Sequence, residues 1–522
     1  MKKYLLKRII FSIFSLVVVI GIVNILIYNL MDREAIFQND NNISKFKYNQ
    51  LATYKLRRQE EYGYIRYMTY ADSDAYKEAS RQETKAAKSF LNSSADLTLD
   101  DLKQNELLNN ILTEYESRGY SVTFLPAIIQ KKGVVSNAEL VFTQEVNVFE
   151  RLGGFFGNLI RFETVWDVND DELTDRYVRI EWDDRSNMPT LVGNGTNHKY
   201  LVYFDEVFPF IHQNILHINL GTSMKLIPNN DVVAYMKQRI NDPYSYEQVV
   251  PKDLGKPDAE TFVTSADFHT ATYRYGPISQ ADLVFYDAEE HYTNTISPNS
   301  GATRIGISFI LGILAMIIAY IIGLPVGIWM AQRKDKLVDK IGNLYIIFIM
   351  AVPSLAYIFM LASIGSNLFN LPYKVAFAPN SVAAYILPII SLALPSIGGL
   401  MKWMRRYMVD QKNSDYVKFA RSQGLSEREI FSKHIARNAF IFLVHSIPAD
   451  ILGCLVGAIV TERVYGVAGI GNMLTRSISM VDNPAIIGVT AFYTALSIIA
   501  LILGDVLLAK YDPRISLTNE RS

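Results

Sequence analysis

The sequence has almost no cysteine and no excess of either charge. Its single cysteine, Cys454, lies in an apolar run, so the 522-residue chain has no intrachain disulfide framework. The formal net charge is −1, which gives no overall basis for binding nucleic acid. Any folded region outside a membrane must therefore be held together by its own hydrophobic core.

The sequence also lacks the motifs of several catalytic classes. It contains no G-x-x-x-x-G-K-[ST] segment to bind nucleotide phosphates, so we predict no ATPase site in this chain. No nucleophile and base stand out as a pair, and we predict no catalytic residue. His212 and His217 do not have the spacing that places both rings on one helix face, and no carboxylate completes a metal site. We therefore predict neither an enzyme nor a metal-binding protein.

Long apolar runs are what the chain has in abundance. Residues 31–304 have the composition of an ordinary soluble protein, whereas the first 30 residues and the part after Ile305 are mostly apolar. A transmembrane helix needs about 20 predominantly apolar residues. Six runs meet this requirement: Ile9–Tyr28, Ile305–Met330, Leu344–Ile364, Val382–Met401, Ala439–Val460 and Ala485–Ala509.

The first apolar run follows the basic segment MKKYLLKR, as in a signal peptide. The run is long for a signal sequence and no small-x-small cleavage site follows it, so we expect an uncleaved transmembrane helix. Several later runs contain proline, which membrane helices tolerate where neighbouring helices or a cavity satisfy the freed backbone groups. The prolines fit either ordinary kinks or helices that line a moving pathway: Pro325, Pro353, Pro388, Pro395 and Pro448.

Basic residues in the short loops predict the orientation of the chain. With a cytoplasmic N-terminus, the inner segments hold 20 Lys and Arg residues, whereas the short outer loops 365–381 and 461–484 hold three. We therefore predict cytoplasmic N- and C-termini. The predicted domains are a cytoplasmic segment with the first helix (1–30), an inserted extracellular domain (31–304) and a membrane core with five helices (305–522).

A polar, mostly basic stretch, Tyr416–Phe440, separates two apolar runs on the predicted cytoplasmic side. Its pattern predicts two short helices joined at Gly424. Ser426 and Glu429 form a Ser-x-x-Glu capping box at the start of the second helix. The stretch fits either an interfacial helix held by basic residues against anionic lipid or a rigid knob that docks into a partner. Its narrow apolar side and its break favour the knob.

Two segments of this stretch carry a family resemblance: Y-x-x-x-A-R-x-x-G-L-S-E-R and H-x-x-R-N-A. They resemble the coupling loop of ABC importer permeases, in the form found in dipeptide and oligopeptide permeases. Ala420 and Gly424 fit the general motif E-A-A-x3-G-x9-I-x-L-P, whereas Lys418 and His434 occupy its Glu and Ile positions. These departures match the peptide subfamily and weigh against a sugar or phosphate importer.

Four segments outside the coupling stretch resemble the same family. Residues Glu462–Gly471 resemble E-x-V-F-x-x-P-G-x-G, with Ala468 in place of proline. Asp482–Pro484 resembles the D-Y-P segment, and the tail from Asp505 to Arg514 resembles the D…Y-x-D-P-R ending. The start Tyr-Leu-Leu-Lys-Arg-Ile-Ile resembles that of B-type oligopeptide permease subunits. The segments occur in the family's order and on the expected sides of the membrane.

The resemblance implies a fold, partners and site residues. It implies an all-α membrane domain of six helices with the type I ABC importer permease fold, a homologous second permease, two ATP-binding subunits and an extracellular substrate-binding lipoprotein. ATP and Mg²⁺ would lie on the ATPase subunits, and this chain would hold no cofactor. The substrate would be an oligopeptide, and the location the plasma membrane of a Gram-positive bacterium. The coupling loop, residues 403–437, would contact the ATPases through Tyr416, Ala420, Arg421, Gly424, Leu425, Ser426, His434 and Arg437.

Ionisable residues in and after the fifth apolar run are candidates for the translocation pathway. An ionised group inside a membrane is costly and usually faces the bundle interior or a water-filled cavity. Asp450, with His445 nearby, fits either contact with the peptide backbone or N-terminal amine, or a buried polar contact to a neighbouring helix or subunit. Glu462 follows on the same run. We predict a pathway position for all three residues.

The pattern of the outside region predicts a mixed α+β domain. Tyr76–Glu116 has the pattern of helices, whereas Tyr177–Trp182, Tyr200–Phe204 and Ala281–Tyr286 alternate like strands. Phe204–Ser223 resembles the membrane-proximal part of the family, so much of the remaining region is an enlargement. The enlargement fits docking of the binding lipoprotein, a cover over the pore mouth, or a structural extension.

Together these patterns predict the permease subunit of an ATP-driven oligopeptide importer, which forms half of the translocation pathway. Transport of dipeptides or nickel chelates fits the same motifs. A membrane sensor or scaffold would explain the large outside domain but leaves the two-helix stretch and the tail motifs unexplained. A secondary transporter would need paired intramembrane charges or an internal repeat, and the sequence has neither.

Overall fold

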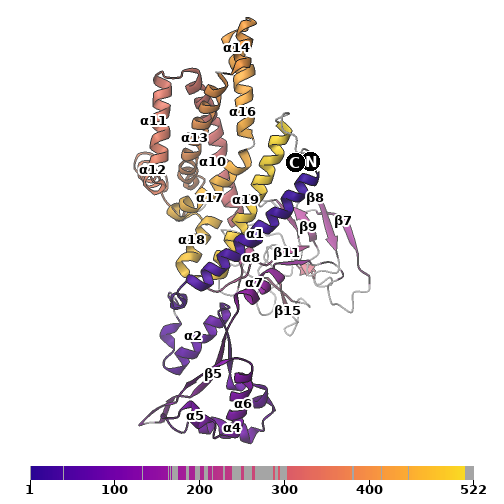
Figure 1. The fold of residues 1–522 in the computed structure, drawn as a ribbon, viewed down its shortest axis with the longest axis vertical. Coiled ribbons are helices and arrows are strands. Elements are labelled where there is room, and N and C mark those ends of the chain that lie inside the picture. Colours follow the sequence, from indigo (N-terminus) through magenta and orange to yellow (C-terminus); the bar gives the residue numbers. More distant parts are fainter. Residues whose placement is uncertain are drawn as a thin grey trace.

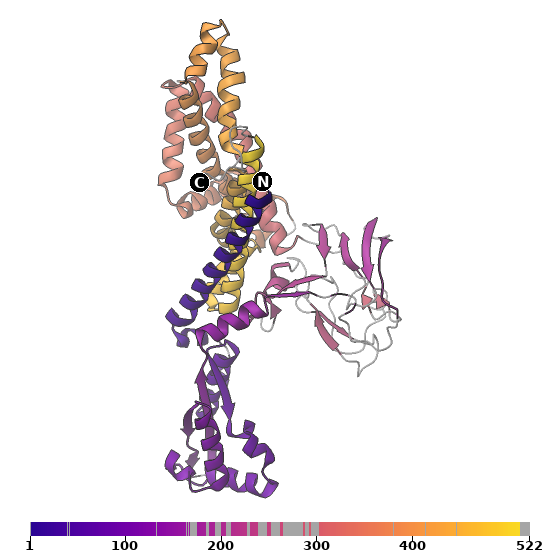
Figure 2. The ribbon, with the colours of Figure 1, turned by 45° about the vertical axis from the view of Figure 1, so that its right-hand side comes forward.

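The computed structural model of the chain describes residues 2–162 apart from 39, 41 and 132, residues 302–511 apart from 379, 380, 413 and 445, and shorter segments between 163 and 301. Its described part is elongated, with a helical bundle at one end and a small mixed domain at the other (Figure 1). A second group of strands lies to one side of the long axis (Figure 2).

Four helices are long and apolar enough to cross a membrane. They are α1 (Lys2–Leu30), α10 (Arg304–Gln332), α13 (Ala383–Lys412) and α19 (Asn483–Tyr511). Long apolar segments become helices in hydrocarbon because every backbone N–H and C=O must find its partner inside the segment. Phe14 on α1 is 65% exposed, and many of its apolar neighbours are also exposed. This exposure suits a helix surrounded by lipid.

Two further pairs of helices are bent at short breaks. α11 (Leu337–Ala351) meets α12 (Ser354–Phe369) at 110°, and α17 (Ile447–Tyr465) meets α18 (Ile470–Met480) at 68°. The first break lies at Pro353, which has no N–H to continue the helical hydrogen bonds. If each bent pair is one span, the described residues contain up to six spans.

Three sequence expectations differ from these helices. The predicted span Leu344–Ile364 is not one helix, since it crosses the sharp bend between α11 and α12. The predicted span Ala439–Val460 falls on two helices, α16 (Arg437–Val444) and α17, with Pro448 in the first turn of the second. The predicted loop 461–484 contains α18, whose apolar side lies in the core. Prolines at the first two breaks, and the packing of α18 in the core, account for these differences.

Close packing of α10 against α13 depends on two glycines spaced four residues apart. A Cβ atom on Gly323 would lie 3.1 Å from the carbonyl oxygen of Ile397, and one on Gly327 would lie 3.0 Å from that of Met401. Small residues at this spacing allow helix backbones to approach closely in membranes, where dispersion contacts drive association.

The distal domain, residues 49–145, lies at the end of the molecule opposite the helical bundle (Figure 1). Three of its strands form an antiparallel sheet in the order β1-β5-β2, and α4 and α6 pack against it. The strands β3 (Ile128–Gln130) and β4 (Gly133–Ser136) form a separate antiparallel pair. Leu91, Leu108 and Phe142 are fully buried between them. Its main elements are α2 (Asn49–Glu61), β1 (Ile65–Thr69), α3 (Asp74–Glu78), α4 (Arg81–Leu91), α5 (Leu99–Leu102), α6 (Glu106–Ser117), β2 (Ser121–Leu125) and β5 (Glu139–Glu145). The predicted helical region thus holds four helices.

The second group of strands forms a four-stranded antiparallel sheet in the order β10-β9-β8-β7. The predicted strands at 177–182 and 200–204 are confirmed, whereas the predicted strand Ala281–Tyr286 lies outside the described residues except for Tyr286, which begins β16 (Tyr286–Asp287). The four strands are β7 (Val178–Asp183), β8 (Met188–Gly193), β9 (Tyr200–Phe204) and β10 (Ile211–Gln213). Because all pairings among the described strands are antiparallel, the inserted region 31–304, which we name the outside region after its predicted location, is of the α+β kind.

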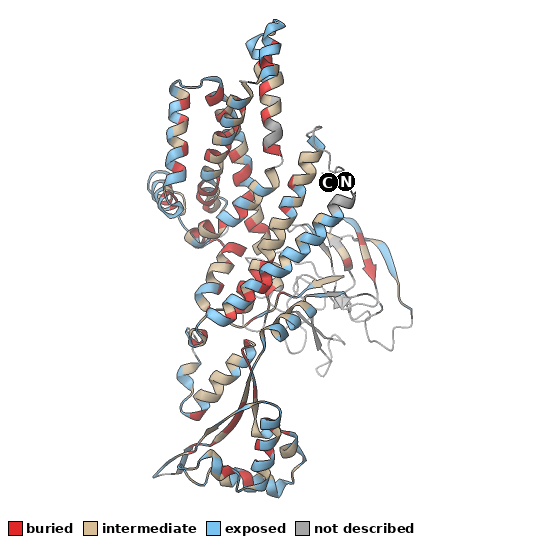
Figure 3. Ribbon diagram, viewed as in Figure 1, coloured by how far each residue is buried: buried red, intermediate tan, exposed pale blue. Residues whose placement is uncertain are grey.

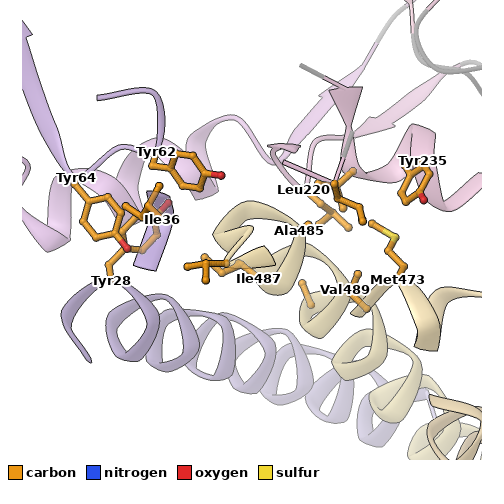
Figure 4. Packing of buried hydrophobic residues seen from close by; sticks show 14 of the residues in the cluster. Tyr28, Ile36, Tyr62, Tyr64, Leu220, Tyr235, Met473, Ala485, Ile487 and Val489 are labelled. Atoms are coloured by element: carbon orange, nitrogen blue, oxygen red, sulfur yellow. The ribbon is translucent and has the colours of Figure 1, made fainter. Parts of the chain in front are cut away.

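The outside region and the long helices share one hydrophobic core. Tyr62 and Tyr64, next to β1, pack in the same cluster as Ile487 and Val489 of α19 and Leu220 of the outside region (Figure 4). Buried positions gather where α1, α18 and α19 meet this region (Figure 3). Each large apolar side chain buried here contributes roughly 1.5–3 kcal/mol. A packed interface therefore joins the two parts.

Candidate functional site

The predicted coupling stretch forms the end of the helical bundle farthest from the distal domain (Figure 1). The two predicted helices and their break at Gly424 are confirmed. The second helix contains a π-helical section, a rare form that is frequent at functional sites. In chain order the elements are α14 (Asp415–Ser422), α15 (Glu427–Glu429), the π-helix η5 (Ile430–Ala436) and α16.

Gly424 makes the turn between the two helices. Its φ is +80°, in the left-handed region that favours glycine. The N–H of Gly424 donates to the carbonyl of Arg421 at 3.0 Å, and the N–H of Leu425 donates to the carbonyl of Ala420 at 3.3 Å. These two bonds are the Schellman motif that ends many helices. A Cβ on Gly424 would meet no atom within 4 Å, so backbone conformation alone requires glycine here.

Polar side chains brace the turn from both sides. Ser426 Oγ accepts from the N–H of Glu429 at 3.3 Å, and Glu429 Oε2 accepts from the N–H of Ser426 at 3.4 Å, which confirms the predicted capping box. Arg421 donates to both carboxylate oxygens of Glu427, at 2.5 and 3.1 Å. These bonds from Arg421 lower the pKa of Glu427, and those from Ser426 lower the pKa of Glu429. Both carboxylates are therefore ionised at neutral pH.

The inner side of the stretch packs against the rest of the bundle. Val417, Ala420, Ile430 and Ile435 are buried in one cluster with methionines of α10 and α13, such as Met404. This packing fixes the turn relative to the long helices. The outer side at the tip is open and carries an apolar residue, Phe419, which is 63% exposed.

The remaining predicted coupling residues lie around this tip. Tyr416 Oη donates to Gln411 Oε1 at 2.6 Å and so ties α14 to the end of α13. Leu425 is partly buried against the cluster, and His434 is half-buried on η5. Arg437 begins α16, and its side chain lies outside the described residues.

Asp450 lies in the first turn of α17, close to α10. Tyr320 Oη of α10 donates to Asp450 Oδ2 at 3.0 Å, and Ser446 Oγ donates to the same oxygen at 2.9 Å. The structure thus shows a polar contact to a neighbouring helix, one of the two interpretations that the sequence left open. The pathway role of Asp450 stays a prediction, and His445 lies outside the described residues.

Glu462 lies near the other end of α17 and is fully buried. Ser308 Oγ of α10 donates to Glu462 Oε1 at 2.6 Å, and the N–H of Asn472 in α18 donates to Oε2 at 2.9 Å. A Cβ on Gly469 would lie 2.4 Å from this carboxylate, which explains glycine at that position. The motif Glu462–Gly471 therefore builds the turn from α17 to α18, and a pathway role for Glu462 stays a prediction.

The predicted residues form separate groups. Asp450 and Glu462 are twelve residues apart on one helix, which places them about 18 Å apart along its axis. The coupling residues lie together at the tip. The described residues hold no group of three or more His, Cys, Asp and Glu side chains that could hold a metal ion.

A largely buried ion pair, which the sequence did not predict, lies behind the tip. Arg405 of α13 donates to both carboxylate oxygens of Asp339 on α11, at 2.5 and 2.7 Å. The N–H of Asp335 also donates to Asp339, at 2.9 Å, and the Asp339 side chain is only 2% exposed. The pair joins the α10–α11 turn to α13. Two opposite charges 66 positions apart give no sequence signal, because only the packing of α11 on α13 brings them together.

The chain is similar to permease proteins of peptide transport systems. Residues 323–517 match the model of the family described as binding-protein-dependent transport system inner membrane component. The chain is 31% identical to the oligopeptide transport system permease protein AmiC of Streptococcus pneumoniae, across 100% of this chain and 99% of that protein. It is 32% identical to the dipeptide transport system permease protein DppB of Bacillus subtilis, across 40% of this chain and 68% of that protein.

The two relatives match different lengths of this chain. The match to DppB covers less than half of this chain, whereas the match to AmiC also includes the enlarged outside region. A full-length relative at this identity shows a common family. The chain belongs to the family of binding-protein-dependent transport system inner membrane components, as a peptide ABC permease.

Proposed function

We propose that this chain is the permease subunit of an ATP-driven oligopeptide importer. It forms half of the translocation pathway, pairs with a homologous permease, and receives energy from two separate ATPase subunits that bind ATP and Mg²⁺. An extracellular lipoprotein delivers the peptide. The full-length similarity to an oligopeptide permease carries this proposal, and the form of the coupling tip supports it.

The coupling tip has the features of a rigid docking knob. The Schellman turn at Gly424, the capping box at Ser426 and the bridge between Arg421 and Glu427 all fix its backbone. Phe419 is the exposed apolar residue that would anchor in a pocket of the ATPase, since aromatic anchors carry much of the energy of protein interfaces. A knob this rigid transmits the closure of its partner as a rigid-body movement.

A short series of helices connects the coupling tip to the middle of the bundle and would carry the movement of the tip. The tip continues through η5 and α16 towards α17, whose first turn holds Asp450. Tyr320 of α10 contacts Asp450, so a shift of α17 also reaches α10. We infer that α10 and α17 line the pathway, with Asp450 facing peptide in one of its states. Peptide uptake by Asp450→Asn at the wild-type rate for every peptide tested would contradict the inferred role of Asp450.

The proposed topology has six crossings, with each bent helix pair as one of them, and both termini in the cytoplasm. The basic residues of the inner loops and the up to six spans in the described residues support it. In this topology the distal domain and the four-stranded sheet lie outside the plasma membrane. There the binding lipoprotein meets the outside region.

Binding of ATPase subunits to the solubilised chain tests the coupling role. Phe419→Ala removes the proposed anchor without disturbing a buried contact, so we expect at least a tenfold loss of affinity, about 1.4 kcal/mol. Phe149→Ala is the matched control, because Phe149 is 82% exposed on the outside helix α7 (Val148–Gly157) and should have no effect. Deletion of residues 416–437 should abolish binding. ATPase association that survives the deletion would overturn the coupling assignment.

Uptake by the complete importer tests the substrate. In proteoliposomes with the second permease and both ATPases, a labelled oligopeptide should accumulate only with ATP and the binding protein. Unlabelled dipeptides and nickel chelates, added in excess, should compete weakly. Stronger competition by either would assign the importer to that substrate instead.

A further inference from the structure

The turn between α18 and α19 holds another carboxylate, that of Asp482, which is fully buried. Ser223 Oγ donates to Asp482 Oδ2 at 2.5 Å, and the N–H of Leu226 donates to the same oxygen at 2.8 Å. The N–H groups of Lys225 and Met224 also donate to this carboxylate, at 3.2 and 3.4 Å. A loop of the outside region, residues 223–226, therefore encloses an acidic side chain of the membrane core.

The next residue binds a different part of the outside region. Asn483 Nδ2 donates to Tyr64 Oη at 2.8 Å, and both side chains are fully buried. Tyr64 directly precedes β1 of the distal domain. Two consecutive residues thus connect the same turn to segments of the outside region that are more than 150 positions apart in the sequence.

The backbone of this turn is strained. Val481, just before Asp482, has a φ of +57°, which is unfavourable for a β-branched residue. The N–H of Asp482 donates to the carbonyl of Ser477 at 2.9 Å and closes the end of α18. Such a conformation persists only where the surroundings enforce it, and it is concentrated at functional sites. The contacts of Asp482 and Asn483 provide this enforcement.

The opposite end of α18 is fixed by another buried carboxylate, that of Glu462. The N–H of Asn472 donates to Glu462 of α17, and the N–H of Ile470 donates to Ser308 of α10 at 3.0 Å. The eleven-residue helix α18 therefore has a buried acidic anchor at each end. One anchor belongs to the helices α10 and α17, and the other binds the outside region.

We propose that α18 is the rigid link between the outside region and the helices α10 and α17, and that Asp482 is the positioning residue which joins the outside region to it. Opening this joint would leave a buried carboxylate and several N–H groups without partners, which is costly. The outside region and α18 therefore move as one body. A binding protein that pushes on the outside region shifts α18, and with it α10 and α17. This inference rests on the proposed function as a peptide importer.

The first experiment measures ATPase activity of the complete importer in lipid, with and without peptide-loaded binding protein. Asp482→Asn keeps the size of the side chain but removes its charge and replaces one acceptor oxygen with a donor. If the remaining oxygen keeps the three bonds made to Oδ2, the new donor faces the N–H of Met224. We expect its stimulation by binding protein to fall at least fivefold, with the basal ATPase rate and the yield of complex unchanged. Asp100→Asn, a change on the exposed surface of the distal domain, is the matched control and should leave stimulation unchanged. Unchanged stimulation in Asp482→Asn, or an equal loss of basal and stimulated rates, would overturn the proposal.

The second experiment leaves Asp482 intact and closes the joint with a disulfide. A Cβ on Gly488 of α19 would lie 3.1 Å from the Cβ of Leu220, slightly closer than the roughly 3.5–4.5 Å found in disulfides, and 2.9 Å from Cγ1 of Val232, which must shift to admit it. The pair Leu220→Cys and Gly488→Cys should therefore cross-link after a small adjustment. If the joint stays closed during transport, peptide uptake by the cross-linked importer should be within twofold of uptake by the reduced sample.

Arrest of uptake by the cross-link, with recovery on reduction, would show that the joint opens and would refute the rigid link. A wild-type importer that takes up no peptide would instead contradict the proposed function. The two failures are thus distinguishable.

Discussion

The turn at Gly424 allows a prediction whose size follows from the structure. Gly424→Ala adds a Cβ that meets no atom within 4 Å, so the change has no steric cost from neighbours. It places alanine at a φ of +80°, and the left-handed conformation costs a residue with a Cβ about 1–2 kcal/mol. The proposed docking of the ATPase depends on this conformation, so its affinity should fall by roughly 5- to 30-fold.

The assay is the affinity of the separately purified ATPase subunits for the solubilised full chain. Gly399→Ala is the matched control: its Cβ also meets nothing within 4 Å, but Gly399 lies inside α13 without a positive φ. This control should bind the ATPases as the wild type does. Gly424→Asn should lose less affinity than Gly424→Ala, since asparagine tolerates the left-handed region better.

Two results would refute this reasoning. If Gly424→Ala bound within twofold of the wild type, the turn conformation would not matter for docking. If Gly399→Ala lost as much affinity as Gly424→Ala, the loss would come from an added methyl group on any glycine. The ranking of the three variants therefore tests the backbone argument itself.

Two further predictions concern charged pairs. Asp339→Ala should lower the free energy of unfolding of the full chain in detergent by up to about 3–5 kcal/mol, because it leaves Arg405 without its buried partner. If the losses from the two single Ala variants simply added in the double variant, a direct interaction between Asp339 and Arg405 would be refuted. The Arg33–Glu145 pair lowers the pKa of Glu145 from its ordinary 4.5, so its contribution is present above pH 4.5 and lost as pH falls below this value. Since both side chains are partly exposed, the pair contributes at most about 1 kcal/mol to the free energy of unfolding. Glu145→Gln should therefore reduce the difference in unfolding temperature between pH 7 and pH 4.

Local sequence signals predicted the coupling tip well. The positive φ of Gly424, the capping box of Ser426 and Glu429, and the buried residues Ile430 and Ile435 all follow from patterns within about ten residues. Such features depend on the conformational preferences of single residues and on hydrogen bonds within one helical turn. Tertiary packing does not need to be known to predict them.

Predictions for the acidic residues were less complete. The cost of charge in a membrane makes Asp450 and Glu462 stand out in and just after an apolar run, and the structure shows that each has hydrogen-bond partners on other helices. Asp482 appeared in the sequence only as part of a family motif. Its partner Ser223 lies 259 positions away, so only the folded chain shows what the carboxylate binds.

The sequence by itself determined the separation of apolar helices from the inserted region 31–304, the two-helix form of the stretch around Gly424 and the resemblance to peptide permeases. Composition and local backbone preference are sufficient for these features, because each is a property of contiguous residues. The tertiary structure alone decided how α10 approaches α13 and how buried carboxylates fix both ends of α18. These features depend on which distant groups packing brings within hydrogen-bond distance, and no local pattern specifies that.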